Sequence, residues 1–252
     1  MLTCQLKGGL GNQLFQIATT FSTAKDNNLK CIFDLNNHIL SHQGQSAFSY
    51  KNNLFNNLPT EENLNLDRFQ TYKESSFSFT QIPKISTHHN VILNGYFQSE
   101  KYFSHNRIDL LNLLNLNHNF NLPKNKTTCS IHIRRGDYLK FPDVHPICAL
   151  DYYDRAISLF NPETQFFVFS DDINWCKTNL NNRGFIFMNN LQDYESLILM
   201  SLCDHNIIAN SSFSWWGAWL NNNKNKKVVS PKRWFSNQIS TIDLIPENWI
   251  AI

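Results

Sequence analysis

Residues 128–134 (TCSIHIR) and residues 165–170 (QFFVFS) decide the fold, because each has the composition and length of a buried strand. Residues 151–160, which lie between them, have apolar positions at helical spacing. Strands that alternate with helices are typical of a parallel, doubly wound α/β sheet. The same alternation continues with predicted helices at 173–179, 194–203 and 213–220 and predicted strands at 185–188, 206–209 and 227–230.

The first residues predict a second unit of the same class. Residues 4–6 are strand-like, the glycine-rich segment 7–13 (KGGLGNQ) follows, and residues 14–21 show helical spacing. Residues 29–34 form another short predicted strand, so the chain opens on a βαβ unit. Residues 36–90 are polar and weakly patterned, and we expect a helix or two and long loops there.

A break at 121–126 (NLPKNK) separates two predicted domains. Before it, residues 91–98 are strand-like and residues 108–116 contain helix-spaced leucines. After it, the regular alternation of strands and helices begins. We therefore expect an N-terminal domain over 1–122 and a C-terminal domain over 123–252.

Composition narrows the class of protein. The 252 residues are 42% hydrophobic and 17% charged, which is enough apolar content for a buried core. With 22 Lys and Arg against 20 Asp and Glu, the net charge of +2 argues against a nucleic-acid-coating protein. No apolar run approaches a membrane-spanning length, and the first residues lack the order of a signal peptide, so we expect a cytoplasmic protein.

Four segments with unusual residues follow predicted strands: 8–13, 132–138, 170–172 and 210–217. In open α/β sheets, ligands bind at the carboxyl ends of the strands. The glycine segment can bring backbone N–H groups at a helix N-terminus close to a phosphate, although a plain tight turn has the same sequence features.

Arg134 and Arg135 directly follow a buried-looking strand and precede Gly136, Asp137 and Tyr138. A guanidinium group makes bidentate contacts with phosphate and stays charged. The alternative is a structural ion pair with Asp137, for which Arg135 is one candidate.

The other two segments also have two interpretations each. Asp171 and Asp172 can accept hydrogen bonds from a ribose or a guanine, or they can cap the following helix. Ser211, Ser212 and Ser214 suit a phosphate at a helix start. Phe213, Trp215 and Trp216 can stack on a base or fill the core, and for the tryptophans we favour the core.

The sequence contains no D-x-D triplet, no H-x-x-H spacing and no cysteine pair. A divalent metal that holds a diphosphate therefore has no evident ligand set. We expect arginines and helix N-termini to neutralise any bound pyrophosphate, with no metal cofactor.

Taken together, four segments resemble the ordered motifs of the bacterial α-1,2-fucosyltransferases, glycosyltransferase family 11. The segments are 8–16, 132–138, 169–172 and 209–220. The resemblance implies transfer of L-fucose from GDP-β-L-fucose to the 2-hydroxyl of a terminal galactose in an oligosaccharide, with inversion and without an essential metal. It implies a GT-B-like pair of doubly wound, Rossmann-like domains that face a cleft, the N-terminal one on the acceptor side and the C-terminal one binding GDP-fucose.

The resemblance also implies roles for individual residues. Arg134 would hold the β-phosphate, His132 and Asp171 would bind the guanine or ribose, and Asn12 would approach the sugar diphosphate. The full predicted donor site consists of Asn12, Gln13, His132, Arg134, Arg135, Asp171, Asp172, Ser211, Ser212 and Phe213.

An inverting transfer also needs a group that removes the proton from the acceptor hydroxyl. Asp137, Asp143 and His145 are the candidate bases, beside Arg134 as the catalytic group at the leaving phosphate. Two other functions stay open: a transferase with a different linkage or nucleotide-sugar, and a non-catalytic nucleotide- or glycan-binding module.

A basic patch near the C-terminus, formed by Lys224, Lys226, Lys227, Lys232 and Arg233, offers a peripheral contact with the anionic inner membrane. The alternative is a solvated surface.

Overall fold

The computed structural model describes residues 1–39, 44–180, 184–236 and 239–252. It confirms the predicted α/β class with parallel sheets. The chain divides into two compact units. Unit 1 contains Met1–Asn117 and Ser240–Pro246, and unit 2 contains His118–Ile239 and Glu247–Ile252. The division thus comes before residue 122, and a short C-terminal segment returns to unit 1, where Asp243 Oδ2 accepts a hydrogen bond from the Phe79 N–H (2.9 Å).

Unit 2 is built on a six-stranded parallel sheet in the order β11-β10-β9-β6-β7-β8. β6 lies in the middle; the next two strands along the chain lie on one side of it, and the last three lie on the other. This is the strand order of a doubly wound dinucleotide-binding fold. The strands are β6 (Thr128–Ile133), β7 (Gln165–Ser170), β8 (Ile186–Phe187), β9 (His205–Ile207), β10 (Val228–Ser230) and β11 (Ile250–Ala251).

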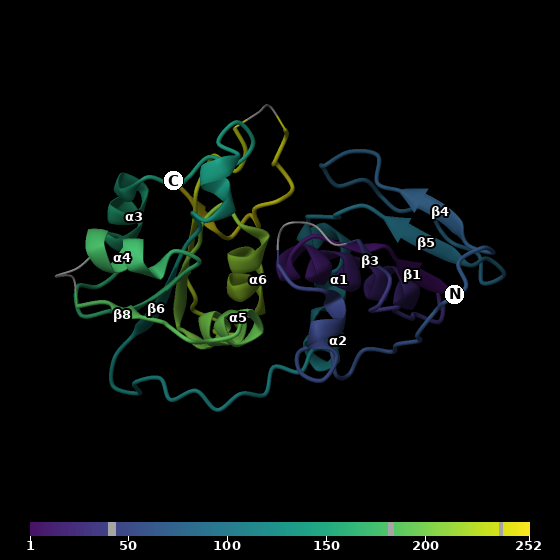
Figure 1. Ribbon diagram of the computed structural model, residues 1–252, viewed down its shortest axis with the longest axis horizontal. Helices are drawn as coiled ribbons and strands as arrows, with labels where there is room; N and C mark the ends of the chain where they lie inside the picture. The colour runs from purple at the N-terminus through teal and green to yellow at the C-terminus, as the bar shows by residue number, and fades with distance from the viewer. Residues whose placement is uncertain (40–43, 181–183, 237–238) are drawn as a thin grey trace. The chain divides into compact units, whose positions relative to one another are not determined.

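Helices cover both faces of this sheet. Figure 1 shows α3 (Leu150–Ile157) and α4 (Ile173–Asn179) on one side and α5 (Asp193–Leu202) and α6 (Ser212–Leu220) on the other. Because side chains alternate along a strand, Cys129, Ile131 and Ile133 point to one face, where they pack with residues of α3 and α4. The predicted strands and helices of this half of the chain are therefore confirmed, apart from small shifts of their ends.

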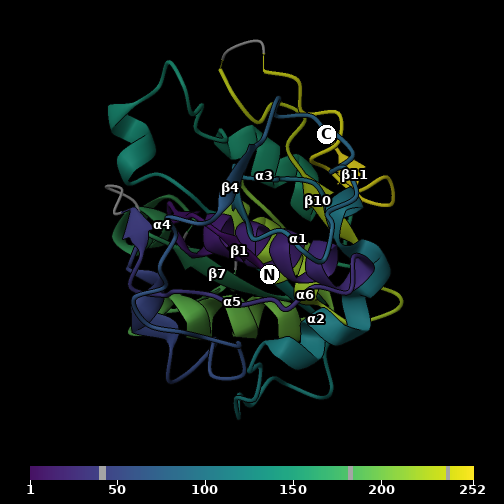
Figure 2. The same cartoon turned by 90° about the vertical axis from the view of Figure 1, so that its right-hand side faces the viewer.

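The opposite face of the sheet carries polar residues that bond to each other. Asn206 of β9 is fully buried and donates hydrogen bonds to Ser130 Oγ of β6 (2.7 Å) and to the Met200 carbonyl of α5 (2.7 Å). Its Oδ1 accepts a hydrogen bond from Asn221, just after α6 (2.8 Å). One amide thus connects the two central strands to the paired helices α5 and α6, which run side by side in Figures 1 and 2.

Unit 1 contains a three-stranded parallel sheet, β1-β5-β4, and a two-stranded sheet, β2-β3. The glycine segment leads from β2 into α1 (Leu10–Asp26), as predicted. Residues 29–34 make only isolated bridges, at Cys31 and Phe33. The strands are β1 (Leu2–Cys4), β2 (Leu6–Lys7), β3 (His38–Ile39), β4 (Gln70–Lys73) and β5 (Val91–Asn94).

The expectation of one or two helices over 36–90 is wrong for the described part of that segment. It contains β3, β4 and the 3-10 turn η1 (Ala47–Tyr50). β4 has the polar sequence QTYK and is held by its backbone pairing with β5, so no apolar pattern marks it.

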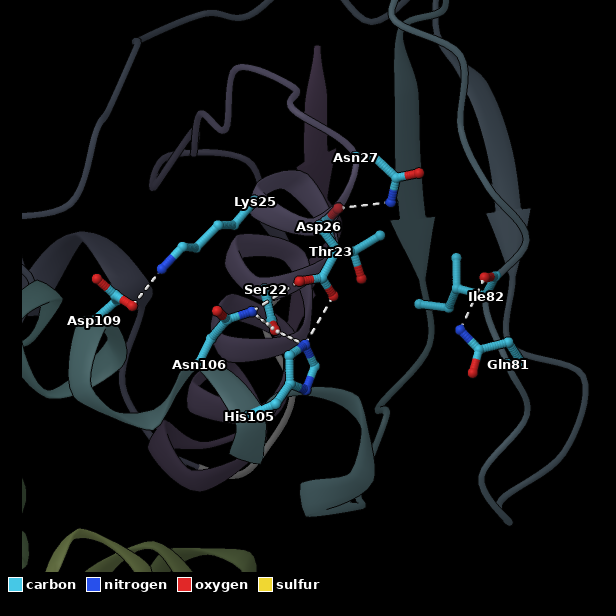
Figure 3. Close-up of polar contacts among 10 residues, drawn as sticks. All are labelled: Ser22, Thr23, Lys25, Asp26, Asn27, Gln81, Ile82, His105, Asn106 and Asp109. Atoms are coloured by element: carbon cyan, nitrogen blue, oxygen red, sulfur yellow. Dashed lines mark hydrogen bonds and ion pairs between the residues drawn. The ribbon is translucent and has the colours of Figure 1, made fainter.

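The C-terminal turn of α1 is fixed by ion pairs and hydrogen bonds (Figure 3). Lys25 pairs with Asp109 of α2 (Arg107–Leu113), and Asp26 pairs with His105 Nε2 (2.8 Å) in the 3-10 turn η3 (Ser104–Asn106). Asn106 donates to Asp26 Oδ1 (3.0 Å) and Ser22 Oγ (2.7 Å). These contacts hold α1 in place, with its N-terminus at the glycine segment.

Asn206→Ala should destabilise the protein by about 2–4 kcal/mol, because it removes the buried hydrogen bonds to Ser130 Oγ, to the Met200 carbonyl and from Asn221. Urea unfolding of Asn206→Ala and Asn222→Ala measures this, since Asn222 is exposed and its loss should change stability by less than about 0.5 kcal/mol. Equal stability of the two variants would contradict the bridging role of Asn206.

Candidate active site

The candidate site of unit 2 lies where the sheet changes direction. β6 and β9 are neighbours, and the chain continues from them toward opposite edges of the sheet. Such a switch point opens a crevice at the carboxyl ends of the two strands. The segments that leave β6 and β9 at this edge are Arg134–Asp137 and Ile208–Ser211.

Arg134 is held by two carboxylates. Its Nη2 lies 2.6 Å from Asp137 Oδ1, and its Nη1 lies 3.1 Å from Asp171 Oδ2. The guanidinium carbon is 5.3 Å from the centre of the Tyr138 ring. Its Nε is buried and has no hydrogen-bond partner among the described residues. The side chain is therefore pre-oriented, with one buried donor left over.

Arg135 has different partners. Its Nε lies 3.3 Å from Asp172 Oδ2, and its guanidinium lies 3.7 Å from the centre of the Trp175 ring. Asp172 Oδ1 also accepts the Trp175 N–H (3.2 Å) and so caps α4. The suggestion that Arg135 is the structural partner of Asp137 is thus wrong, because Arg134 takes that place. Arg135 and Asp172 together anchor the start of α4.

Asp171 lies in close contact with the segment after β6. Its Oδ1 accepts the backbone N–H of Arg135 (2.9 Å). A Cβ atom at Gly136 would stand 2.6 Å from Asp171 Oδ2, so only glycine leaves room for the carboxylate. Both oxygens of Asp171 are used within the protein, and any bond it makes to a nucleotide would be additional to these two.

His132 is buried at the end of β6, with 4% of its surface exposed. Burial, with a smaller contribution from the charge of Arg134, lowers its pKa to about 3, so the ring is neutral at physiological pH. Its Nδ1 has no partner within the described residues, and its ring centre lies 5.4 Å from that of Phe213. The structure thus brings together two residues predicted for the donor site.

His145 stacks on Tyr138, with ring centres 4.4 Å apart and planes 12° apart. Burial is the main cause that lowers its pKa below the ordinary value of 6.5. Nδ1 is buried and lacks a partner in the described part of the chain. Tyr138 in turn donates a hydrogen bond to the Asn210 carbonyl after β9 (3.0 Å), which links the segments that follow the two central strands.

The start of α6 carries the predicted serines. Ser211 is the N-cap residue and is buried, but its side chain does not bond to the first turn. Ser212 and Phe213 are partly exposed in that turn. Trp215 and Trp216 are almost fully buried, which confirms their assignment to the core.

Asp143 stands apart from these contacts. Its side chain is exposed and has no hydrogen-bond or ion-pair partner among the described residues. Of the three candidate bases, Asp137 is bound to Arg134, and His145 is a half-buried neutral ring.

Asn12 and Gln13 belong to unit 1, at the glycine segment. Gly8 has a φ of +79°, and a Cβ there would stand 2.5 Å from Asn12 Nδ2. Gln13 donates to the Gly8 carbonyl (3.0 Å), and Asn12 Oδ1 accepts a hydrogen bond from Gln98 (2.7 Å). The conformation of the glycine segment is thus fixed by the side chains of Asn12 and Gln13 in α1 and by Gln98 from the loop after β5.

Sequence reasoning missed several polar residues of this edge. His38 Nε2 contacts the Gly8 carbonyl (3.2 Å), and Glu74 binds the backbone after β5. His38 begins β3 and Glu74 follows β4, and the sequence marks neither strand. Gln98, by contrast, ends the predicted strand 91–98 and could have been suggested by its place at the carboxyl edge.

The structure also bears on metal ligands and on membrane contact. Within residues 1–39, 44–180, 184–236 and 239–252, no group of three His, Cys, Asp or Glu side chains is arranged to hold a metal ion. No described helix has the length and apolar character needed to cross a membrane. In the basic patch, Lys226 donates to the Asn221 carbonyl (2.7 Å) and Lys227 to the Leu159 carbonyl (2.6 Å), so two of its cations are already engaged.

The chain is similar to known sugar transferases. The O-antigen biosynthesis glycosyltransferase WbnK of Escherichia coli is 36% identical over 188 residues, which are 70% of this chain and 60% of that protein. The alpha-1,2-colitosyltransferase of Escherichia coli is 29% identical, with 100% of this chain and 99% of that protein covered. The galactoside 2-alpha-L-fucosyltransferase Sec1 of Mus musculus is 26% identical over 87% of this chain and 64% of its own length. The chain therefore spans less than two thirds of WbnK and Sec1.

Among solved structures, the fucosyltransferase NodZ from Bradyrhizobium is similar, with a TM-score of 0.53 and 12% identity over 86% of this chain and 91% of that one. At this identity the likeness concerns the fold alone. A family model described as glycosyl transferase family 11 matches residues 1–252. The resemblance indicated by the four motifs is thereby confirmed, and this chain belongs to glycosyl transferase family 11.

Proposed function

We propose that this chain is an inverting glycosyltransferase that moves L-fucose from GDP-β-L-fucose to the 2-hydroxyl of a terminal galactose. The nucleotide binds unit 2 and the acceptor binds unit 1, which is the division that the GT-B resemblance implies. Family membership and relatives named as α-1,2-fucosyl- and α-1,2-colitosyltransferases support the type of reaction. The O-antigen role in the name of WbnK supports an oligosaccharide acceptor.

One observation carries the donor site: buried nitrogens without protein partners gather at the switch point of the unit 2 sheet. They are Arg134 Nε and His132 Nδ1, counted among the described residues; His145 Nδ1, which also has no partner there, is left for the acceptor hydroxyl. A buried polar atom left without a partner costs about 1–3 kcal/mol, so its retention needs a reason. A polar ligand bound at the carboxyl ends of β6 and β9 supplies that reason.

The mechanism follows from the charge that develops in the reaction. The acceptor oxygen forms a bond to the anomeric carbon while the bond from that carbon to the β-phosphate oxygen of GDP breaks. Negative charge therefore moves onto the phosphate, and the proton leaves the acceptor hydroxyl. A guanidinium group that is already oriented stabilises such charge without reorganising.

The carboxylates around Arg134 reduce the net positive charge of the site and at the same time fix the direction of the guanidinium group. Two arginines, Arg134 and Arg135, stand against three aspartates, Asp137, Asp171 and Asp172, in direct contact with them. These five side chains together carry no net positive charge, so they do not attract anions in general. A diphosphate gains most from the N–H groups of Arg134 that its carboxylate partners leave free, and this favours geometry over bulk charge.

A colitosyl donor is the second candidate, because the α-1,2-colitosyltransferase aligns over almost its whole length with this chain. Incubation with GDP-fucose, the corresponding colitosyl donor, GDP-mannose and UDP-sugars, with a panel of galactosides and NMR analysis of any new linkage, distinguishes the two. Turnover of no donor would return the chain to the class of non-catalytic binding modules.

Replacement of Arg134 tests the phosphate role. Arg134→Lys keeps the charge but loses the planar fork, so kcat should fall more than GDP-fucose affinity. Arg134→Ala should lower kcat by about 10²- to 10³-fold, the loss expected for one donor at a developing anion. Arg155→Ala is the matched control, because Arg155 is a surface arginine with 61% of its side chain exposed.

In the same series, Arg135→Ala should mainly lower the melting temperature, because Arg135 braces Asp172 and Trp175. Initial rates, calorimetry with GDP and thermal melts make the comparison. A near-wild-type kcat in folded Arg134→Ala would remove Arg134 from the reaction.

The metal requirement follows from the same account. If Arg134 and the N-terminus of α6 balance the diphosphate, activity should persist in EDTA. The measurement is the initial rate with and without EDTA, and then with added Mn²⁺ or Mg²⁺. Complete loss with EDTA and recovery with metal would show that the arginine account is wrong.

His145 is the base that we favour among the three candidates, because burial lowers its pKa and leaves Nδ1 free to accept a proton. A lowered pKa keeps the ring neutral above that value, so kcat should fall only as the pH drops through a value below 6.5. His145→Gln should lower kcat by about 10²-fold or more and remove this acid limb. An unchanged pH profile in the variant would leave proton removal to another group.

A further inference from the structure

The loop that follows β5 carries an exposed aromatic ring at the carboxyl edge of the unit 1 sheet. β4, β5 and β1 are parallel, so the segments after Lys73 and Asn94 leave the sheet on the same side. The glycine segment leaves β2 and connects to this loop through the Gln98–Asn12 hydrogen bond (2.7 Å). Ligands of open α/β sheets bind at this edge.

The loop is held in a conformation that costs energy. Phe97 has a φ of +52°, in the left-handed region that non-glycine residues seldom adopt. Such a residue costs on the order of 1–3 kcal/mol and persists only where the surroundings impose it. Here the Phe97 ring is buried and meets the Tyr102 ring edge-on, with ring centres 5.5 Å apart.

Glu74 supplies the other constraint. Its carboxylate accepts the N–H groups of Tyr96 (2.6 Å) and Phe97 (2.9 Å). A Cβ atom at Gly95 would overlap Glu74, so the close approach requires glycine there. Two hydrogen bonds, a buried ring and a glycine thus fix the direction in which Tyr96 points.

The result is a ring in solvent with polar groups beside it. Tyr96 is 38% exposed, and Lys7 Nζ lies 4.8 Å from the centre of its ring. Lys7 Nζ also donates to Asn94 Oδ1 (3.0 Å), which leaves ammonium N–H groups for a further acceptor. Lys7 Nζ lies over one face of the ring, and the part of Tyr96 that stays exposed suits a neutral pyranose, whose C–H face can stack on the ring while its hydroxyls bond to the ammonium group and the amide.

We propose that Tyr96, Lys7 and Asn94 form the subsite for the acceptor sugar, with Glu74 as the residue that positions it. This inference rests on the proposed glycosyltransferase function and deepens it. The acceptor is favoured over the donor because the subsite offers one ammonium group already bound to Asn94, whereas a nucleoside diphosphate needs several converging cationic donors. Lys7 is the first residue of the glycine segment, and the hydrogen bond from Gln98 to Asn12 ties the loop that carries Tyr96 to the same segment.

Two pairs of variants test the subsite, each with a matched control. Tyr96→Ala is compared with Phe48→Ala, because Phe48 is an exposed aromatic (47%) with Lys51 Nζ at 5.3 Å. Lys7→Met is compared with Lys84→Met, because Lys84 is an exposed lysine of the same unit, beside the C-terminal turn of α1. Glu74→Gln tests positioning, since an amide nitrogen cannot accept the second backbone N–H.

The readouts are the KM for the galactoside that the wild type uses, kcat at saturating acceptor, the Kd of GDP, and the slow hydrolysis of GDP-fucose without acceptor. Saturation-transfer NMR with methyl β-D-galactoside reports binding independently of turnover. For Tyr96→Ala and Lys7→Met we expect the acceptor KM to rise about tenfold, with GDP affinity and donor hydrolysis within about twofold of wild type. Glu74→Gln should raise the same KM while its melting temperature shows that the fold persists.

The outcomes separate this inference from the proposed function. If the wild type transfers no sugar to any galactoside, the proposed function fails. If it does transfer sugar and Tyr96→Ala has the acceptor KM and NMR signal of Phe48→Ala, the subsite assignment is wrong while the function stands. A change in GDP-fucose hydrolysis or donor affinity, with the acceptor KM unchanged, would also overturn it, because the ring would then contact the donor sugar.

Discussion

The position of Arg134 between Asp137 and Asp171 is the interaction on which the candidate site depends. It joins the turn after β6 to the segment after β7, and Gly136 allows the approach because it has no side chain. Tyr138 extends the same group to the Asn210 carbonyl after β9. Three of the four segments that the sequence singles out are of one unit, and these contacts bring all three together. An arginine held in this way loses little conformational freedom when it binds an anion, which is the condition for stabilising charge in a transition state.

The sheet that carries this group is asymmetric for a physical reason. One face packs apolar residues of β6 against α3 and α4. The other face holds Ser130 and His132, and the buried amide of Asn206 satisfies part of this polar surface. Among the described residues of that face, His132 Nδ1 is buried without a hydrogen-bond partner. Its burial therefore costs stability, and the cost grows in acid, where the unfolded chain gains a proton that the folded ring does not take up.

Unit 2 could be predicted from the sequence because strand-like and helix-like segments alternate regularly along it, and β7 and α4 have the predicted bounds. In unit 1 the sequence predicted the glycine segment with α1, the strand β5 and the helix α2. β4 has no apolar pattern, since an edge strand is held by its backbone, and Glu74 becomes recognisable only through the turn it binds. The ion-pair partners of Arg134 and Arg135 could also not be predicted from the sequence. Asp137 is three residues from Arg134 and two from Arg135, and the curvature of the turn decides which of them it meets.

At the carboxyl edges of both units, a glycine leaves room for a polar side chain. Asn12 lies against Gly8, Glu74 against Gly95 and Asp171 against Gly136. In each case a Cβ atom at the glycine would overlap the polar side chain. Left-handed Phe97 and the unpartnered nitrogens of His132 and Arg134, both judged on the described residues, add unfavourable free energy at these edges. The left-handed backbone and the unpartnered nitrogens each cost stability, and a chain selected for stability alone would avoid them. Costly features at the edges where α/β sheets bind ligands are what a binding role for these polar groups would require, and this is the physical basis of the proposed donor and acceptor sites.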